Sequence, residues 1–117
     1  MKEPLNEMQR LVVEAASDKK AFDILLLDLR NRSDLTDYFM ICSGNSKMQV
    51  QAIADSILET IYQSNYKLSS TEGYSSGSWV VLDLANIIVH VFHKDVRFHY
   101  DLERLWGDVP IIKAINE

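Results

Sequence analysis

The sequence has a single cysteine and no long hydrophobic run, and each shortage excludes a class of protein. Cys42 alone allows neither an internal disulfide nor a cluster of metal-binding thiolates, as expected in a reducing compartment. Charged residues or histidine interrupt every apolar stretch well before the roughly 20 residues that a membrane span requires. No apolar block of secretory length follows residues 1–4, so we expect a cytoplasmic protein without a membrane span.

The sequence also lacks a basic stripe, internal repeats and low-complexity linkers. Its 17 Asp and Glu outnumber its 12 Lys and Arg, which gives a net charge of −5, and the cations are scattered. Because contact with a nucleic acid backbone depends on clustered cations, we do not expect direct sequence-specific nucleic acid binding. An acidic surface favours basic partners, although it also serves solubility alone. With 117 residues, 47% of them hydrophobic, we expect a single domain over residues 1–117.

Two stretches with apolar residues at i, i+3 and i+4 spacing predict amphipathic helices. The first covers residues 5–16, and the second begins at Ser46 and continues to residue 62. Ser46 and Gln49 have the S-x-x-Q spacing of a capping box, in which each side chain binds the other residue's backbone N–H. Both helices should therefore pack on a core through one face.

Five runs rich in β-branched, leucine and aromatic residues predict strands, at residues 22–29, 37–43, 66–71, 79–84 and 87–92. The first two runs could form a hairpin, and Ala85-Asn86 reads as a two-residue turn between the last two. Asn suits a positive φ in such a turn, whereas Ala does not. We expect an α/β fold in which a mixed sheet of about five strands packs with helices.

The register of the hairpin at residues 79–92 divides its side chains between two faces. Pairing Leu84 with Ile87 gives an aliphatic face, typical of a core, that consists of Val80, Leu82, Val89 and Val91. The opposite face consists of Trp79, Val81, Asp83, Ile88, His90 and Phe92. Large aromatics beside a carboxylate and an imidazole are typical of a protein-binding surface. The alternative is that helices cover this face and that Trp79 is an internal aromatic residue.

The tail of the chain predicts a short final helix that Gly107 can end. Four apolar side chains have helical spacing, namely Phe98, Leu102, Leu105 and Trp106. The charged side chains should form a solvated face, which comprises Arg97, Asp101, Glu103 and Arg104. The apolar segment 111–115 either packs onto the domain or joins a partner.

Catalytic constellations are weak. His90 and His93 are three residues apart on a predicted strand, so their side chains leave opposite faces and cannot hold one metal together. Cys42 lies in an apolar strand, where burial raises a thiol pKa and disfavours a nucleophilic role. The sequence has no glycine-rich phosphate loop, and we expect no catalytic residue, no metal site and no cofactor. The competing interpretation is an Mg²⁺-dependent enzyme that uses Asp28, Asp37 and Asp83.

Two blocks of the sequence match the pattern of a known family in order and spacing. The first contains D-L-T-D-Y-F-M-I-C-S-G-N-S at 34–46, followed by Gln49-Val50 and A-I-A-D at 52–55. The second contains Glu72-Gly73, W-V-V-L-D at 79–83, V-H-V-F at 89–92, Arg97 and Y-D-L-E-R-L-W at 100–106. The blocks span nearly the whole chain, and they resemble the ribosomal silencing factor family, also called Iojap-like.

The resemblance implies a fold like that of nucleotidyltransferases, without their metal-binding carboxylates. It also implies binding to the large ribosomal subunit at its intersubunit face, through the fourteenth large-subunit ribosomal protein. There the protein would obstruct joining of the small subunit when nutrients are short, which is steric repression of translation without chemistry. Relatives commonly have Gly-Asp in the hairpin turn, so Ala85-Asn86 puts any role of a turn carboxylate in question.

The residue pattern and the resemblance point to one surface. We predict that the ribosomal protein contacts Trp79, Asp83, His90, Phe92, Arg97, Tyr100, Asp101, Leu102, Glu103 and Trp106. The aromatic side chains would supply affinity, and the carboxylates would steer a basic partner. A further interpretation is a self-associating adaptor, in which the same hairpin face or an edge strand forms a homodimer.

Overall fold

A six-stranded sheet runs through the computed structural model, which describes residues 5–105 and 108–115. The strands are β1 (Phe22–Asp28), β2 (Tyr38–Gly44), β3 (Ser70–Glu72), β4 (Trp79–Asp83), β5 (Ile87–His93) and β6 (Ile111–Ile115). They follow the order β3-β4-β5-β2-β1-β6, in which β2 and β5 are parallel and the other neighbours are antiparallel. The expected α/β class is confirmed, and the sheet has one more strand than the five we counted.

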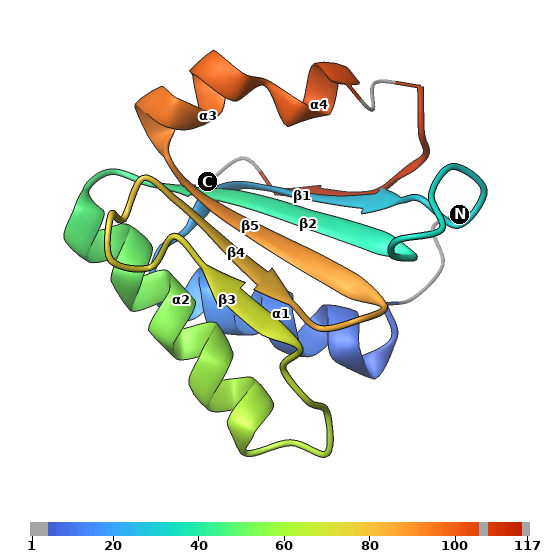
Figure 1. Cartoon of the computed structure of the whole chain (residues 1–117), viewed down its shortest axis with the longest axis horizontal. Coiled ribbons are helices and arrows are strands. Elements are labelled where there is room, and N and C mark those ends of the chain that lie inside the picture. The colour runs from blue at the N-terminus through green and yellow to red at the C-terminus, as the bar shows by residue number, and fades with distance from the viewer. Residues whose placement is uncertain (1–4, 106–107, 116–117) are drawn as a thin grey trace.

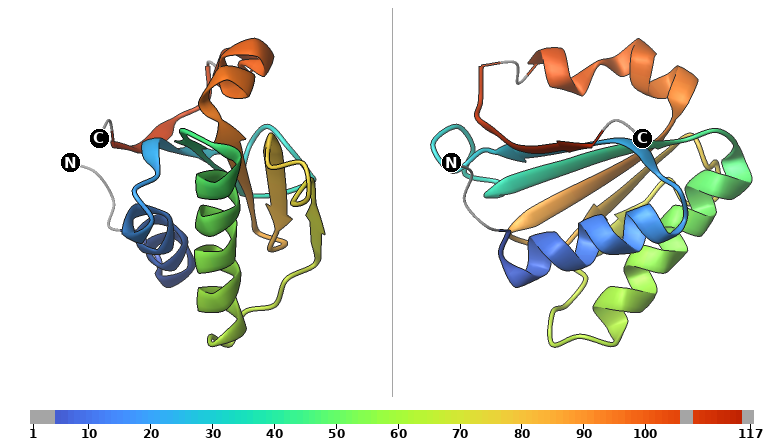
Figure 2. Two further views of the ribbon diagram at one scale, coloured as in Figure 1. Left: turned by 90° about the vertical axis from the view of Figure 1, so that its left-hand side faces the viewer. Right: turned by 180° about the vertical axis from the view of Figure 1, so that it is seen from behind.

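Helices cover both faces of this sheet (Figures 1 and 2). They are α1 (Glu7–Asp18), α2 (Lys47–Tyr62), α3 (Lys94–Tyr100) and α4 (Leu102–Leu105). The two long helices lie against one face, and the two short ones pass over the other (Figure 2). None of the helices in the described part of the chain has the length and apolar character needed to cross a membrane.

The two long helices begin at different kinds of cap. Asn6 and Gln9 form a complete capping box before α1, with N···O distances of 2.8 and 3.0 Å, which the sequence pattern alone did not reveal. Ser46 accepts from the backbone N–H of Gln49, as predicted for α2. The predicted hydrogen bond from the backbone N–H of Ser46 to the Gln49 side chain is wrong, because that side chain accepts from the N–H of Asn45 at 2.6 Å.

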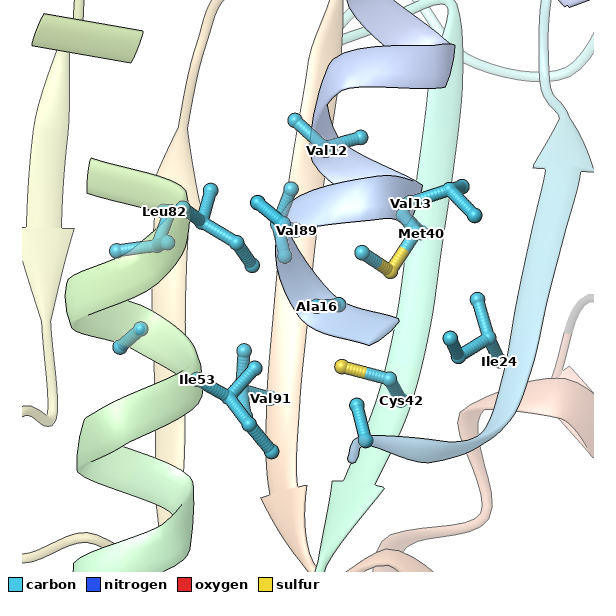
Figure 3. Packing of buried hydrophobic residues seen from close by; sticks show 14 of the residues in the cluster. Val12, Val13, Ala16, Ile24, Met40, Cys42, Ile53, Leu82, Val89 and Val91 are labelled. Atoms are coloured by element: carbon cyan, nitrogen blue, oxygen red, sulfur yellow. The ribbon is translucent and has the colours of Figure 1, made fainter. Parts of the chain in front are cut away.

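The larger core lies between the sheet and the helices α1 and α2 (Figure 3). The predicted aliphatic face of the β4–β5 hairpin is confirmed as part of it, because its four side chains are fully buried, namely Val80, Leu82, Val89 and Val91. Cys42 points into the same core, and burial raises the pKa of its thiol to about 12. The thiol is therefore inert and structural, as its apolar strand predicted.

A smaller core occupies the opposite face of the sheet, under α3, α4 and the segment that follows them. Its buried members are Leu27, Leu29, Phe39, Ile41, Ile88, Phe92 and Val109. Consecutive apolar residues of β2 and β5 therefore alternate between the two cores, which explains the nearly continuous apolar runs in these strands. Half of the hairpin face that we considered as a partner surface is buried, namely Ile88, His90 and Phe92.

The hairpin turn at Ala85-Asn86 has the predicted register but not the predicted conformation. The expected pairs, from Trp79 with Phe92 to Asp83 with Ile88, are all present. Ala85, not Asn86, takes the positive φ of 73°, and the N–H of Asn86 donates to the carbonyl of Leu84 at 3.0 Å. These features define a γ-turn centred on Ala85, a conformation that is rare and strained for a residue with a Cβ.

The tail differs most from the sequence prediction. The single final helix is wrong, because Asp101 adopts a left-handed conformation with φ 49° and separates α3 from α4. The segment 111–115 packs onto the sheet as β6, which pairs with β1 at the edge. Trp106 and Gly107 lie outside the described residues, so the predicted helix end stays a prediction.

Candidate protein-binding site

Trp79, at the start of β4, lies at the centre of a group of ring side chains that we call the Trp79 cluster. Its other members are His90, Phe92 and Tyr100. The indole is stacked on Phe92 with centroids 4.9 Å apart, and Tyr100 from the end of α3 approaches it at the same centroid distance. Such contacts add about 0.5–1.5 kcal/mol per pair to the burial of the rings, so the cluster holds a defined shape.

His90 supports the cluster from within the sheet. The indole Nε1 of Trp79 donates to Nδ1 of His90 at 3.0 Å, so the imidazole carries its proton on Nε2. Phe39 makes an edge contact with this ring, at a centroid distance of 4.6 Å. The His90 side chain is 6% exposed, and burial lowers its pKa to about 4. His90 is therefore neutral near pH 7.

Only part of the Trp79 cluster reaches the surface. Tyr100 is 54% exposed and Trp79 is half-buried, whereas Phe92 is fully buried and His90 nearly so. The expectation that His90 and Phe92 are displayed is wrong, because α3 and α4 cover that end of the sheet. The two buried rings form a rigid base beneath the indole and the phenol, which are left as the accessible pair.

A shallow hollow of about 430 Å³ borders this accessible pair. Ser76 and Ser78 of the loop before β4 form one wall, and Val96 and His99 of α3 form the other. These wall residues were not among the predicted site residues, because the loop and the helix meet only in the folded chain. A hollow between two aromatic side chains is suited to receive a side chain of a partner.

Gly73 determines how the loop approaches Trp79. Its φ is +81°, and a Cβ at this position would clash with the backbone carbonyl oxygen of Trp79. Glycine is required here for two reasons. Residues with a side chain disfavour this φ, and the site has no space for a Cβ. The Glu72-Gly73 pair in the second sequence block therefore has a structural explanation.

Arg97 anchors α3 to the sheet. Its Nη1 donates to the backbone carbonyl of Asp23 at 2.6 Å and to Oγ of Ser43 at 2.9 Å. The expectation that Arg97 belongs to a solvated helix face is wrong, since it is half-buried between α3 and the strands β1 and β2. By holding α3, Arg97 also holds Tyr100 over Trp79.

The remaining predicted site residues are not gathered around the indole. Asp83 lies four residues from Trp79 along β4, a separation of about 13 Å at the usual strand rise, and it accepts from the N–H of Ala85. Asp101 forms the corner between α3 and α4, and Leu102 packs against the smaller core. The Glu103 side chain and Trp106 lie outside what the structure describes.

The alternative magnesium site gains no geometric support. The described residues contain no group of three or more His, Cys, Asp or Glu side chains that could hold a metal ion. Asp28 instead binds Arg30 at 2.7 Å, and the hydrogen bonds from Arg30 hold the pKa of Asp28 below its usual value. Asp83 binds its own hairpin turn, so two of the three proposed ligands have structural partners.

The fold and the site together define a small α/β protein with a mixed sheet, helices on both faces and a preformed aromatic surface cluster. Residues 2–117 match the family model described as ribosomal silencing factor during starvation (RsfS). The chain belongs to this ribosomal silencing factor family, as its sequence blocks indicated.

Individual relatives agree with this assignment. The ribosomal silencing factor of Bacillus subtilis (strain 168) is 46% identical over 102 residues, which cover 87% of this chain and 86% of that protein. The ribosomal silencing factor of Halalkalibacterium halodurans is 43% identical over 107 residues, or 92% of each chain. A crystal structure from Bacillus halodurans, 41% identical, superimposes with a TM-score of 0.82 over 92% of this chain and 97% of that one.

Proposed function

We propose that this protein represses translation in the cytoplasm by binding the large ribosomal subunit at its intersubunit face. The contact is made with the fourteenth large-subunit ribosomal protein, and the bound protein blocks association of the small subunit, above all when nutrients are limiting. The repression is steric, and no residue of this chain has a chemical role in it.

The observation that carries this proposal is the half-exposed pair of Trp79 and Tyr100 on a buried base. Tryptophan and tyrosine are the side chains that most often dominate binding energy at protein interfaces. His90 and Phe92 fix the indole before a partner arrives, so binding loses little side-chain entropy there. A pre-organised aromatic pair on an acidic protein suits a basic partner such as a ribosomal protein.

The other predicted contact residues take different roles in this proposal. Arg97, Asp101 and Leu102 shape the site by positioning α3 and α4, whereas Asp83 and Glu103 are proposed to pair with Lys or Arg of the partner. Charges at a rim act mainly on the association rate and its salt dependence. Trp106 is proposed to extend the aromatic surface.

Co-sedimentation with separated large and small subunits tests the proposal. We expect binding to the large subunit alone and loss of subunit joining when the small subunit is added afterwards. The variants Trp79→Ala and Tyr100→Ala should each bind at least about tenfold more weakly, as expected for hot-spot residues. Tyr62→Ala is the matched control, because Tyr62 is 90% exposed on α2, on the opposite side of the sheet.

Binding to neither subunit would exclude the proposed function. Equal binding by the Trp79→Ala, Tyr100→Ala and Tyr62→Ala variants would leave ribosome binding intact but would exclude the Trp79 cluster as the contact.

We also propose that the unbound protein can form a homodimer. The observation that supports a homodimer is that β6 lies at the edge of the sheet, where Ile111 is 56% exposed. An edge strand presents backbone donors and acceptors that a second copy can pair with. Mass measurements over a range of concentrations test this, and a monomer at all concentrations would exclude it.

A further inference from the structure

A second, larger cleft of about 980 Å³ lies next to the Trp79 cluster. Its walls include Lys94, Arg97, Phe98, His99, Tyr100 and Arg104. Tyr100 and His99 also border the hollow beside Trp79, so the two depressions share one ridge. A partner that covers the Trp79 cluster therefore lies within reach of this cleft.

The charge of the cleft is opposite to that of the whole protein. Three Lys or Arg and two Asp line it, a balance of +1 with His99 neutral, whereas the chain carries −5. The rest of the chain thus carries −6, and the cleft is a local exception on an acidic molecule. Three of the twelve Lys and Arg, all within residues 94–104, line this cleft.

The backbone turn at Asp101 accounts for this grouping. Asp101 adopts its left-handed conformation directly after α3, and its carbonyl accepts from the N–H of Arg104 at 3.1 Å. The chain therefore turns between α3 and α4, so that Arg104 lines the same cleft as Lys94. Arg97 forms the fixed wall through its bonds to β1 and β2, while Lys94 and Arg104 stay exposed.

Aromatic side chains stand exposed between these cations. Phe98 is 87% exposed and Tyr100 is 54% exposed, and both line the cleft. Lys and Arg that alternate with exposed rings are typical of surfaces that contact nucleic acid, since the cations attract phosphates and the rings stack on unpaired bases. An acidic protein segment would also match these cations and rings, and affinity for the isolated ribosomal protein separates that alternative from RNA.

We propose that this cleft contacts the phosphate backbone of ribosomal RNA, next to the ribosomal protein on which the Trp79 cluster docks. The proposal rests on the proposed function, which places the protein on a particle made of RNA and protein. Lys94 and Arg104 bind phosphates, and Phe98 covers a neighbouring sugar or base. The contact adds affinity that is independent of sequence, in agreement with the expectation of no sequence-specific nucleic acid binding.

The salt dependence of large-subunit binding tests the cleft. The double variant Lys94→Ala/Arg104→Ala should bind the large subunit more weakly. Its plot of log K against log salt concentration should also be less steep, by about 1 for each phosphate that the variant no longer binds. Its affinity for the isolated fourteenth ribosomal protein should equal that of the unmodified chain. The double variant Arg10→Ala/Lys67→Ala, which removes two exposed cations outside the cleft, is the matched control.

A directed cleavage experiment locates the RNA. Cys42 is buried and its thiol pKa is about 12, so a Phe98→Cys variant can be labelled selectively with an iron chelate that produces hydroxyl radicals. On the large subunit this probe should cut ribosomal RNA at a discrete site. The same probe on a Tyr62→Cys variant, on the other side of the sheet, should cut at that site weakly or not at all.

The outcomes separate the two proposals. If the unmodified chain fails to sediment with the large subunit, the proposed function is wrong and the cleft contact is wrong with it. If the unmodified chain binds but the cleft variant keeps its salt slope, or if the Phe98 probe gives no localised cleavage, only the cleft contact is wrong. An equal loss of affinity for the isolated ribosomal protein would make the cleft part of the protein interface and would overturn the RNA contact.

Discussion

The indole Nε1 of Trp79 donates a hydrogen bond to Nδ1 of His90 across 3.0 Å, so a buried imidazole orients a half-exposed indole. Within the described residues, the other ring nitrogen, Nε2, has no hydrogen-bond partner. A buried donor without a partner costs about 1–3 kcal/mol, so stability alone would favour an apolar residue here. The hydrogen bond by which His90 orients Trp79 explains why a polar ring occupies this position.

Acid should weaken the fold through His90. Because burial lowers its pKa from 6.5 to about 4, the unfolded chain binds a proton more readily than the folded chain between these values. The His90 contribution should lower the free energy of unfolding by up to about 3 kcal/mol as the pH drops from 6.5 to 4. Above pH 6.5 this contribution should stay constant. Urea unfolding of the protein and of a His90→Gln variant, compared pH by pH, measures the difference. Parallel curves would contradict the prediction.

The hairpin turn should tolerate a stabilising change at Ala85. Its φ of 73° strains a residue with a Cβ by about 1–2 kcal/mol, and glycine removes that strain at a smaller entropic cost. Ala85→Gly should therefore raise the free energy of unfolding by about 0.5–1 kcal/mol. Asn86→Gly, at the neighbouring position without a positive φ, should give no such gain. A loss of stability in Ala85→Gly would show that the turn is not strained.

The loop before β4 should not tolerate a side chain at Gly73. Gly73→Ala places a Cβ against the carbonyl of Trp79 at a φ of +81°, and we expect a loss of about 2–4 kcal/mol of stability. Trp79 should shift as well, so large-subunit binding should weaken even at temperatures where the variant stays folded. Ser75→Ala, on the exposed part of the same loop, should leave both properties unchanged. Thermal unfolding and co-sedimentation give the two measurements.

The anchor of α3 should depend on the geometry of the arginine side chain. Arg97→Met removes the bonds to Asp23 and Ser43 but keeps the apolar stem, and we expect a loss of about 1–3 kcal/mol. Arg97→Lys should recover only part of this loss, because an ammonium group lacks the planar fork. Amide hydrogen exchange should accelerate in α3 and stay unchanged in α1. Uniform acceleration would mean that Arg97 stabilises the whole fold and not this helix.

The parts of the fold that the sequence predicted are those that local patterns encode. The register from Trp79 to Phe92 follows from alternation of side chains, and α2 follows from apolar spacing behind the Ser46 cap. β6 carries no such pattern in five residues, and its partner Ile24 is far away in the chain. Its pairing could not be read from the sequence.

The proximity of Trp79, His90 and Phe92 was predictable from the sequence, but their exposure was not. The hairpin register places the three side chains on one face, whereas the burial of Phe92 depends on where α3 lies. That position is set by the bonds of Arg97 to distant strands, which leave no trace in local spacing. The cationic cleft was not predicted for the same reason, since the turn at Asp101 groups its charges.

The position of β6 in the sheet affects how the chain can fold during synthesis. β1 is made well before its outer neighbour β6, and Ile24 pairs with Ile115. A nascent chain therefore carries an apolar strand whose outer edge has no neighbour until β6 has been translated. Synthesis that stops before β6 would leave that edge open to association with other chains, so loss of β6 should appear first as aggregation.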